Sequence, residues 1–375
     1  MKQFFAINKF KEEKKFENKS IRNYGIDLLR MFSMINIIIL HINLCSGQLK
    51  LPININKNIW RLEAMSYFAV DCFGLISGIV GYKKYKFSNL IYIWINSSFY
   101  SSIFSLYFYY NNRMNFKSTI LSFFPILIDY HWYVNAYFCL YLFIPLLNFG
   151  INKLNEKIFR NLVIFYFLFF SFYYLIGLIL NKSEKDFIFL KNGYSTNWLI
   201  ILYIVGGYLG KYIIINKNII SFKYYIICLL IYIFSALITS ESFFYLDRFK
   251  RRLYRSRILY NYLSPTIIFE ALSLIMMFSK FSINNKFSIK IISFFTPFTL
   301  NITLLHSRLF AERIITFNWL NRLKSNIKFI AIYQHSLILY FFLGLIDYLR
   351  SIFFKILKIK KFCLFIEYKF SKLLN

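Results

Sequence analysis

Residues 24–45 read YGIDLLRMFSMINIIILHINLC, and this stretch decides the class of fold. It is long and apolar enough to cross the hydrocarbon core of a bilayer, which takes about 20 residues of helix. Similar apolar segments recur along the whole chain. We therefore predict an all-α, polytopic membrane helix bundle of about ten transmembrane helices, with spans at 24–45, 64–82, 88–110, 131–149, 161–180, 197–215, 223–240, 264–281, 288–307 and 329–349.

The composition supports a membrane protein and argues against a nucleic-acid-binding one. Hydrophobic residues make up 58% of the chain and charged residues only 17%, against about 25% charged in soluble domains. The net charge is +30, but Lys and Arg lie between apolar segments and at both ends, where they would face anionic lipid. We expect membrane lipids, and no nucleic acid, as partners. The five cysteines are scattered without a CxxC pair, so neither a disulfide framework nor a metal site is predicted.

The basic residues also predict the orientation. They are more numerous in the loops on the side of the N-terminus, which places both termini in the cytoplasm for an even number of spans. The chain then divides into a basic cytoplasmic arm (1–23), a transmembrane domain (24–350) and a basic cytoplasmic tail (351–375). Segment 118–129 is too short to span and contains a proline, so we expect an interfacial or re-entrant piece. Segment 247–257 (DRFKRRLYRSR) is strongly basic although it falls on the predicted outer side of the membrane. Either one of the predicted spans is misplaced, or this segment forms a basic outer rim.

The first span carries Asp27, Arg30 and His41. Ionisable groups are costly in hydrocarbon and normally face the bundle interior. Arg30 and His41 are separated by three helical turns plus about 20°, so both lie on one face, about 16 Å apart along the axis. Asp27 lies one turn before Arg30 and can pair with it. Two interpretations stay open: a catalytic stripe, or an interfacial ion pair with a histidine that only hydrogen-bonds another helix.

The segment RNYGIDLLRMFSMINIIILHI, residues 22–42, resembles the first-span signature of the acyltransferase-3 family of integral-membrane acyltransferases. That signature is an Arg or Lys, ten residues and then a His, usually with an Asp-x-x-Arg at its start. Arg30 and His41 match the spacing, and Asp27 with Arg30 matches the preceding motif.

Three later segments also resemble motifs of this family. AVDCFGLISGIVGYKK (69–84) is similar to its Asp-x-Phe-Phe-x-x-Ser-Gly span, HWYVNAYFCLYLFIPLLN (131–148) to its Trp-Tyr span, and TLNITLLHSRLF (299–310) to its Leu-Leu-His span. The chain departs from the family in two places. It has only lysines where an Arg-x-x-Arg is common at the third span, and Gly74 replaces the second Phe of the Ser-Gly motif.

The resemblance implies an enzyme. It would be a membrane O-acyltransferase, in the first place an O-acetyltransferase, of a bacterial plasma membrane. The donor would be acetyl-CoA or another acyl-CoA from the cytoplasm, used as a substrate with no cofactor bound. The acceptor would be a hydroxyl of a cell-surface or exported polysaccharide, as a glycan or lipid-linked glycan.

The resemblance also implies roles for individual residues. His41 would be the catalytic base or a transient acyl carrier, and Arg30 would contact the donor or hold Asp27. The expected substrate-binding residues are Ser77, Trp132, Tyr133 and His306.

Each of these motifs also has an ordinary structural interpretation. Gly74 and Gly78 form a small-residue face that lets another helix approach closely. Trp132 and Tyr133 could be interface aromatics, and His306 could be polar glue or a second imidazole of the cavity.

Other functional classes fit the sequence less well. A polysaccharide polymerase would show a long outer loop with paired arginines, and a flippase-type transporter would show interrupted half-spans. Neither feature is evident in this sequence. A purely structural membrane subunit would not need three ionisable residues in one span.

Overall fold

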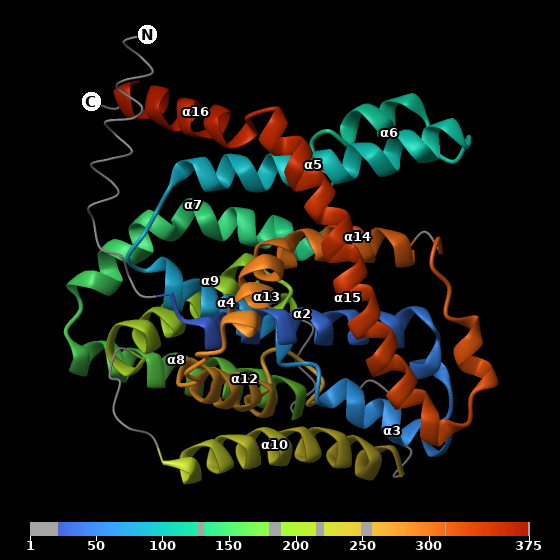
Figure 1. The fold of residues 1–375 in the computed structure, drawn as a ribbon. Helices are drawn as coiled ribbons and strands as arrows, with labels where there is room; N and C mark the ends of the chain where they lie inside the picture. Colours follow the sequence, from blue (N-terminus) through green and yellow to red (C-terminus); the bar gives the residue numbers. More distant parts are fainter. Residues whose placement is uncertain are drawn as a thin grey trace.

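The computed structural model describes residues 22–126, 131–179, 189–214, 221–248, 257–311 and 313–373. Its described residues form an all-helical bundle, joined by short loops and single turns of 3₁₀ or π-helix (Figure 1). The helices are α2 (Tyr24–Cys45), α3 (Ile53–Ala64), α4 (Ala69–Gly81), α5 (Phe87–Tyr110), α6 (Phe116–Leu121), α7 (Trp132–Lys153), α8 (Glu156–Ile179), α9 (Thr196–Tyr208), α10 (Phe222–Arg248), α12 (Pro265–Ser279), α13 (Lys286–Phe295), α14 (Thr299–Ala311), α15 (Ser325–Ile356) and α16 (Ile359–Leu373).

The predicted polytopic bundle is confirmed. Seven helical stretches are long and apolar enough to cross a membrane, and each coincides with a predicted span. The predicted segments 88–110, 197–215 and 264–281 are also helical in their described parts, but α5 is rich in Ser, Asn and Tyr, while α9 and α12 are short. The seven stretches are Tyr24–Cys45, Ile55–Gly81, Trp132–Lys153, Glu156–Ile176, Phe222–Arg248, Lys286–Phe310 and Ser325–Ile356.

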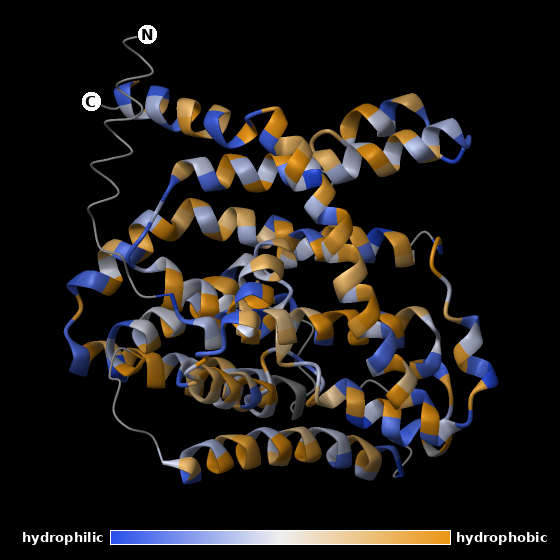
Figure 2. Ribbon diagram, in the orientation of Figure 1, coloured by the Kyte–Doolittle hydropathy of each residue, from blue (hydrophilic) through white to orange (hydrophobic). Residues whose placement is uncertain are grey.

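Many polar side chains are buried inside the bundle, and much of its apolar surface is exposed. In the apolar 18-residue stretch of α8 only 11% is buried, whereas 67% of the corresponding stretch of α2 is buried. Large apolar side chains of α8, α10 and α15 are exposed, and Figure 2 shows apolar residues all along α10. An apolar surface of this extent would not stay monomeric in water, and it fits a lipid environment.

Helix α2 lies at the centre of the bundle. It packs against α4, α12, α13, α14 and α15, while α10 and the α5–α16 pair lie at opposite edges (Figure 1). The helix that carries Asp27, Arg30 and His41 is therefore surrounded by protein, as its ionisable side chains require.

Glycines hold α4 against α9. A Cβ atom added to Gly78 would lie 2.0 Å from the carbonyl oxygen of Tyr203, and one added to Gly206 would lie 2.0 Å from that of Leu75. Only a residue without a side chain permits this backbone approach. The packing role predicted for the Gly74–Gly78 face is confirmed, since Gly74 also meets the side chain of Leu202.

The predicted segments outside the main spans are only partly covered by the described residues. Segment 118–129 contains the end of the short helix α6, and its last residues fall outside the described part of the chain, as do most of 1–23 and of the basic segment 247–257. Helix α15 continues past residue 350 to Ile356, and most of the predicted tail is helix α16. The side of the membrane on which each terminus lies stays a prediction.

Candidate active site

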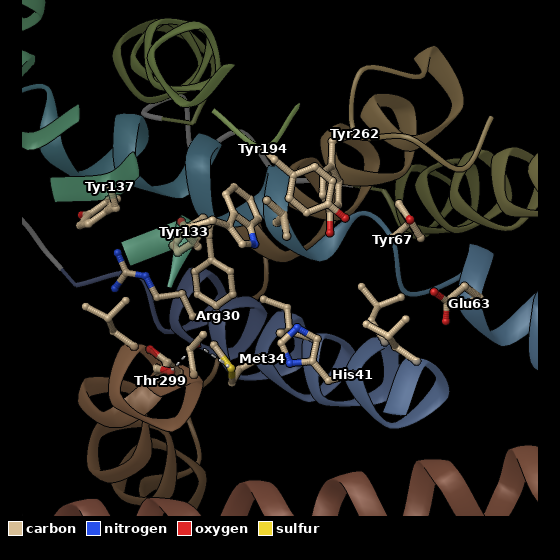
Figure 3. Close-up of a pocket in the computed structure, with 18 of the residues that line it drawn as sticks. Arg30, Met34, His41, Glu63, Tyr67, Tyr133, Tyr137, Tyr194, Tyr262 and Thr299 are labelled. Carbon is tan, nitrogen blue, oxygen red and sulfur yellow. Dashed lines mark hydrogen bonds between the residues drawn. The ribbon is translucent and has the colours of Figure 1, made fainter. Parts of the chain in front are cut away.

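A cavity of about 600 Å³ runs along α2 in the interior of the bundle (Figure 3). Arg30 lies toward one end, His41 in the middle and Glu63 toward the other end. The predicted common face of Arg30 and His41 is confirmed, because both side chains line this cavity. The remaining walls come mainly from α3, α4, α7, α14 and the 3₁₀ turn η4 (Thr296–Phe298), and from the loops before α9 and α12.

The Arg30 end is organised by the first turn of α2. The Asn23 side chain caps the helix by accepting a hydrogen bond from the Ile26 amide. Arg30 Nη1 lies 3.0 Å from Asp27 Oδ1, which confirms the predicted pair. Arg22 Nε lies 2.5 Å from the other carboxylate oxygen of Asp27. The Asp27 carboxylate thus has two cationic partners, and the Arg30 guanidinium lies at its end of the cavity, on the side of Tyr137 and away from His41 (Figure 3).

His41 is hydrogen-bonded to a second histidine. His306 Nε2 lies 2.9 Å from His41 Nδ1, and His306 Nδ1 lies 2.7 Å from the carbonyl oxygen of Ile302. A carbonyl oxygen only accepts, so His306 Nδ1 carries a proton, and Nε2 of the neutral ring accepts a hydrogen bond from the protonated Nδ1 of His41. His41 Nε2 is then left with a lone pair, and no described residue donates a hydrogen bond to it. This is the tautomer that a general base requires.

The other predicted residues occupy different places. Trp132, Tyr133 and Ser77 line the cavity, and the Ser77 hydroxyl donates to the Phe73 carbonyl at 2.7 Å. His306 is fully buried behind His41 and is not part of the cavity lining. Of the two roles considered for it, the structure favours a hydrogen-bond partner over a second cavity imidazole.

An aromatic wall forms the Glu63 end of the cavity. The Trp132 ring lies 4.6 Å from that of Tyr194, which lies 5.0 Å from that of Tyr262, which in turn lies 5.2 Å from that of Tyr67. We refer to Trp132, Tyr194, Tyr262 and Tyr67 as the aromatic wall. Burial raises the pKa of the Tyr194 and Tyr262 phenols, so both stay protonated and can donate hydrogen bonds.

A carboxyl group lies beside the aromatic wall. Glu63 is buried, and its Oε2 accepts a hydrogen bond from Asn43 Nδ2 at 2.7 Å. Because Asn43 follows His41 on α2, this contact ties the carboxyl to the helix that carries the imidazole. Asp71, which matched the Ser-Gly motif, does not line the cavity: it is fully buried and accepts from Trp198 Nε1 at 3.0 Å.

Sequence reasoning missed a third histidine, His131. The Ser307 hydroxyl donates to the Thr303 carbonyl at 2.7 Å, so it accepts from His131 Nδ1 at 3.1 Å. His131 precedes the Trp-Tyr motif directly, and Ser307 follows His306. These neighbouring positions were the available signal, although only the fold joins them. Within the described ranges, no group of three or more His, Cys, Asp or Glu residues could hold a metal ion.

Comparison with known proteins identifies the family. The acyltransferase domain model of the acyltransferase-3 family matches residues 23–346, which is most of the chain. No curated protein and no solved structure matches. The match covers α2 with its Arg30–His41 stripe, and it ends inside α15. The chain belongs to the acyltransferase-3 family and is a multi-pass membrane acyltransferase.

Proposed function

We propose that this chain transfers an acyl group, in the first place acetyl, from a cytoplasmic acyl-CoA to a hydroxyl of a cell-surface or exported glycan. The observation that carries the proposal is the His306–His41 hydrogen bond, which leaves His41 Nε2 as a base in the middle of a cavity with two different ends. Such a cavity can hold a donor at one end and an acceptor at the other.

The Arg30 end suits the donor. An acyl-CoA carries its phosphates at one end of a long flexible arm and its thioester at the other. A guanidinium binds phosphate oxygens in a bidentate manner, and Arg30 lies three helical turns from His41 on the same face of α2. A donor held by its phosphates near Arg30 can extend its thioester along the cavity toward the imidazole.

The chemistry then needs one proton to pass from the acceptor hydroxyl to the leaving thiolate by way of His41. His41 Nε2 takes the proton of the acceptor hydroxyl while the hydroxyl oxygen attacks the thioester carbonyl. The carbon–sulfur bond breaks, the thiolate takes this proton from the imidazolium, and an ester and a free thiol remain. His306 Nε2 accepts the hydrogen bond from His41 Nδ1 throughout, so it stabilises the imidazolium and keeps the ring oriented.

The same nitrogen could instead carry the acyl group. In that route His41 Nε2 attacks the thioester carbonyl, the carbon–sulfur bond breaks and CoA leaves as a thiolate. The acceptor hydroxyl then attacks the acyl-imidazole, the bond between the acyl carbon and Nε2 breaks, and the hydroxyl proton passes to the thiolate, so the same ester and free thiol remain. The His306 contact serves both routes equally, since it leaves Nε2 as the reactive atom. Rapid quenching of the enzyme with labelled acyl-CoA in the absence of acceptor separates them, because only the carrier route labels the protein.

The aromatic end suits a glycan. A pyranose ring presents apolar C–H faces and a rim of hydroxyl groups. The ring faces of the aromatic wall can pack against the C–H faces of the sugar. The phenols of Tyr194 and Tyr262 and the carboxyl of Glu63 can form hydrogen bonds with its hydroxyl groups. We assign no cofactor; the acyl-CoA is a substrate.

The orientation follows from the distribution of basic residues. With both termini in the cytoplasm of a bacterial cell, the start of α2 and Arg30 lie nearer the donor, and the aromatic wall lies nearer the acceptor. Reporters fused after residue 375 and within 182–196 are expected on opposite sides of the plasma membrane. If both reporters lie on one side, this orientation is wrong.

A direct assay tests the proposed activity. Membranes that contain the chain are incubated with acetyl-CoA labelled in the acetyl group and with glycan from the same cells. We expect labelled acetyl groups to appear in the glycan and to be released from it by mild base. Membranes that lack the chain should give no labelled glycan. A polymerase would lengthen the glycan without adding acyl groups, and a transporter would not consume acetyl-CoA. Either result would contradict the proposal.

A further inference from the structure

A second cavity, of about 440 Å³, lies where α15 ends and α16 begins, against α5. Four of the residues that line it are lysines, none is acidic, and the lysine side chains are exposed. We call this cavity the lysine pocket. It is lined by Tyr92, Ser351, Phe354, Lys355, Lys358, Lys360 and Lys361.

The kink between the two helices creates the pocket. Lys358 has φ = 56°, in the left-handed region that residues with a side chain seldom adopt. Its amide donates to the Lys355 carbonyl, and its own carbonyl accepts from the Phe362 amide. This turn brings lysines of α15 and of α16 to one cavity. A strained conformation of this kind is retained where the surrounding structure or the function requires it.

The start of α16 adds to the positive potential. The first amides of a helix lack intrahelical acceptors and carry the positive end of the helix dipole. α16 begins at Ile359, between Lys358 and Lys360 of the pocket. The helix thus begins among the four lysines that line the cavity, an arrangement that favours an anion.

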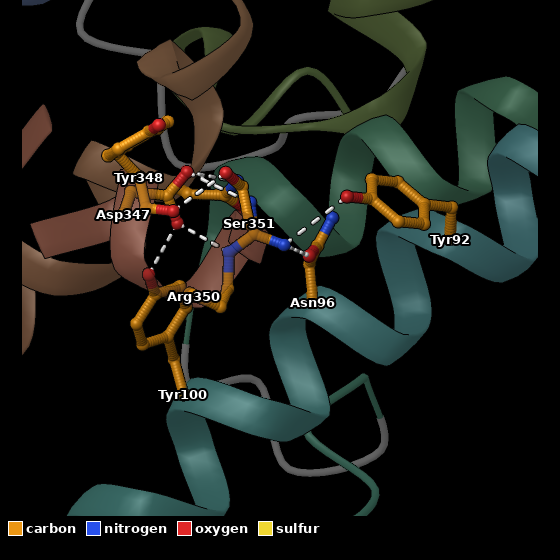
Figure 4. Close-up of polar contacts among 8 residues, drawn as sticks. Tyr92, Asn96, Tyr100, Asp347, Tyr348, Arg350 and Ser351 are labelled. Carbon is orange, nitrogen blue, oxygen red and sulfur yellow. Dashed lines mark hydrogen bonds and ion pairs between the residues drawn. The ribbon is translucent and has the colours of Figure 1, made fainter. Parts of the chain in front are cut away.

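Asp347, a carboxylate one helical turn before Ser351 of the pocket, is already paired. Asp347 is fully buried, and Arg350 Nε and Nη2 lie 2.6 and 3.0 Å from its two oxygens. Its oxygens also accept hydrogen bonds from Tyr100 (Figure 4) and from Asn301. Its charge is therefore satisfied by these partners. Arg350 in turn donates to the Tyr92 hydroxyl at 3.3 Å, which fixes one wall.

We infer that the lysine pocket binds a phosphate group, supplied by the headgroup of an anionic membrane lipid. The location supports this source. α15 is long and apolar enough to span the membrane and ends at Ile356, so the pocket lies where a span reaches the surface. α16 exposes Phe362 and Phe370 beside its lysines, as expected of a helix in contact with lipid. Basic pockets between such helices bind anionic headgroups.

The test compares two variants of the purified full chain in detergent. Lys355→Gln with Lys360→Gln removes two charges from the pocket, and Lys369→Gln with Lys372→Gln removes the same number from the far end of α16. The probes are phosphatidic acid, phosphatidylglycerol, phosphatidylcholine, CoA and inorganic phosphate, each added separately. The measurements are the shift in unfolding temperature and the mass of lipid retained in native mass spectrometry.

We expect phosphatidic acid and phosphatidylglycerol, and not phosphatidylcholine, to stabilise the wild type and the far-end variant. The pocket variant should bind them at least about tenfold more weakly. The same difference for CoA or inorganic phosphate alone would support a phosphate site but overturn the lipid as its source. Equal responses of the two variants to every probe would overturn the inference.

Discussion

His306 Nε2 lies 2.9 Å from His41 Nδ1, although 265 positions separate the two residues in the chain. The Ile302 carbonyl fixes the proton on the far nitrogen of His306, so the order of donors and acceptors runs in one direction, from His41 to the backbone of α14. This places His306 in the position of a residue that orients a base, and it makes the contribution of that contact measurable.

We predict that His306→Ala lowers kcat by about tenfold or more, less than the loss of His41 itself, because the base loses its orientation but not its reactive nitrogen. The KM for acyl-CoA should not change. His306→Gln, whose side-chain oxygen can accept from His41 Nδ1, should recover part of the activity. If both variants lose the same activity at equal expression, the contact is structural. Complete loss in His306→Ala would make His306 the base.

Arg30 is predicted to act on the donor and not merely to balance Asp27. Since Arg22 also pairs with Asp27, removing Arg30 does not strand a buried carboxylate. Because the donor would still lack its guanidinium partner, the double change Asp27→Asn with Arg30→Gln should stay inactive, with weakened CoA binding. Arg30→Lys should fall well short of wild type, because an ammonium cannot bind phosphate in a bidentate manner. CoA affinity and transfer are measured together, and a fully active double variant would leave Arg30 as scaffolding.

The aromatic wall is predicted to bind the acceptor. Trp132→Leu should raise the KM for the glycan several-fold, about the effect of losing 1 kcal/mol of ring contact, and leave the KM for acyl-CoA unchanged. Trp319→Leu is the matched control, because Trp319 packs against His335 and lies outside the cavity lining. A larger change in the KM for acyl-CoA than in that for the glycan would move the donor to this end.

The α4–α9 interface predicts a stability difference between two glycines. Gly78→Ala should lower the unfolding temperature, with a loss of about 1–3 kcal/mol, because its Cβ meets a backbone carbonyl that cannot move aside. Gly150→Ala is the control, since a Cβ there meets no described atom within 4 Å and alanine favours helix. Thermal unfolding in the same detergent compares them. Equal stability would mean that α4 and α9 can separate without cost.

Features set by helix periodicity could be predicted from the sequence. The Asp27–Arg30 pair and the common face of Arg30 and His41 follow from spacing within one helix, and both are present. The Gly74–Gly78 face was predictable for the same reason. The seven apolar stretches coincide with predicted spans because length and hydropathy are local properties.

Contacts between distant segments could not be predicted. Tyr194 and Tyr262 come from loops before α9 and α12, and nothing in their local sequence indicates that they share a wall. Glu63 lies at the edge of a predicted span and gave no motif. Asp71 matched a motif but is buried against Trp198 instead of lining the cavity. The partner of His41 was uncertain for the same reason, because only the packing of α14 against α2 brings His306 to it.

The central claim is that His41 performs the chemistry, and His41→Ala tests it most directly. His335→Ala is the matched control, because His335 lies on α15, outside the cavity lining, and packs against the rings of Phe317 and Trp319. Both variants are measured at equal amounts in membranes, as transfer of labelled acetyl from acetyl-CoA to glycan. We predict a loss of at least about a hundredfold for His41→Ala and wild-type transfer for His335→Ala. Transfer by His41→Ala within a few-fold of wild type would contradict the account.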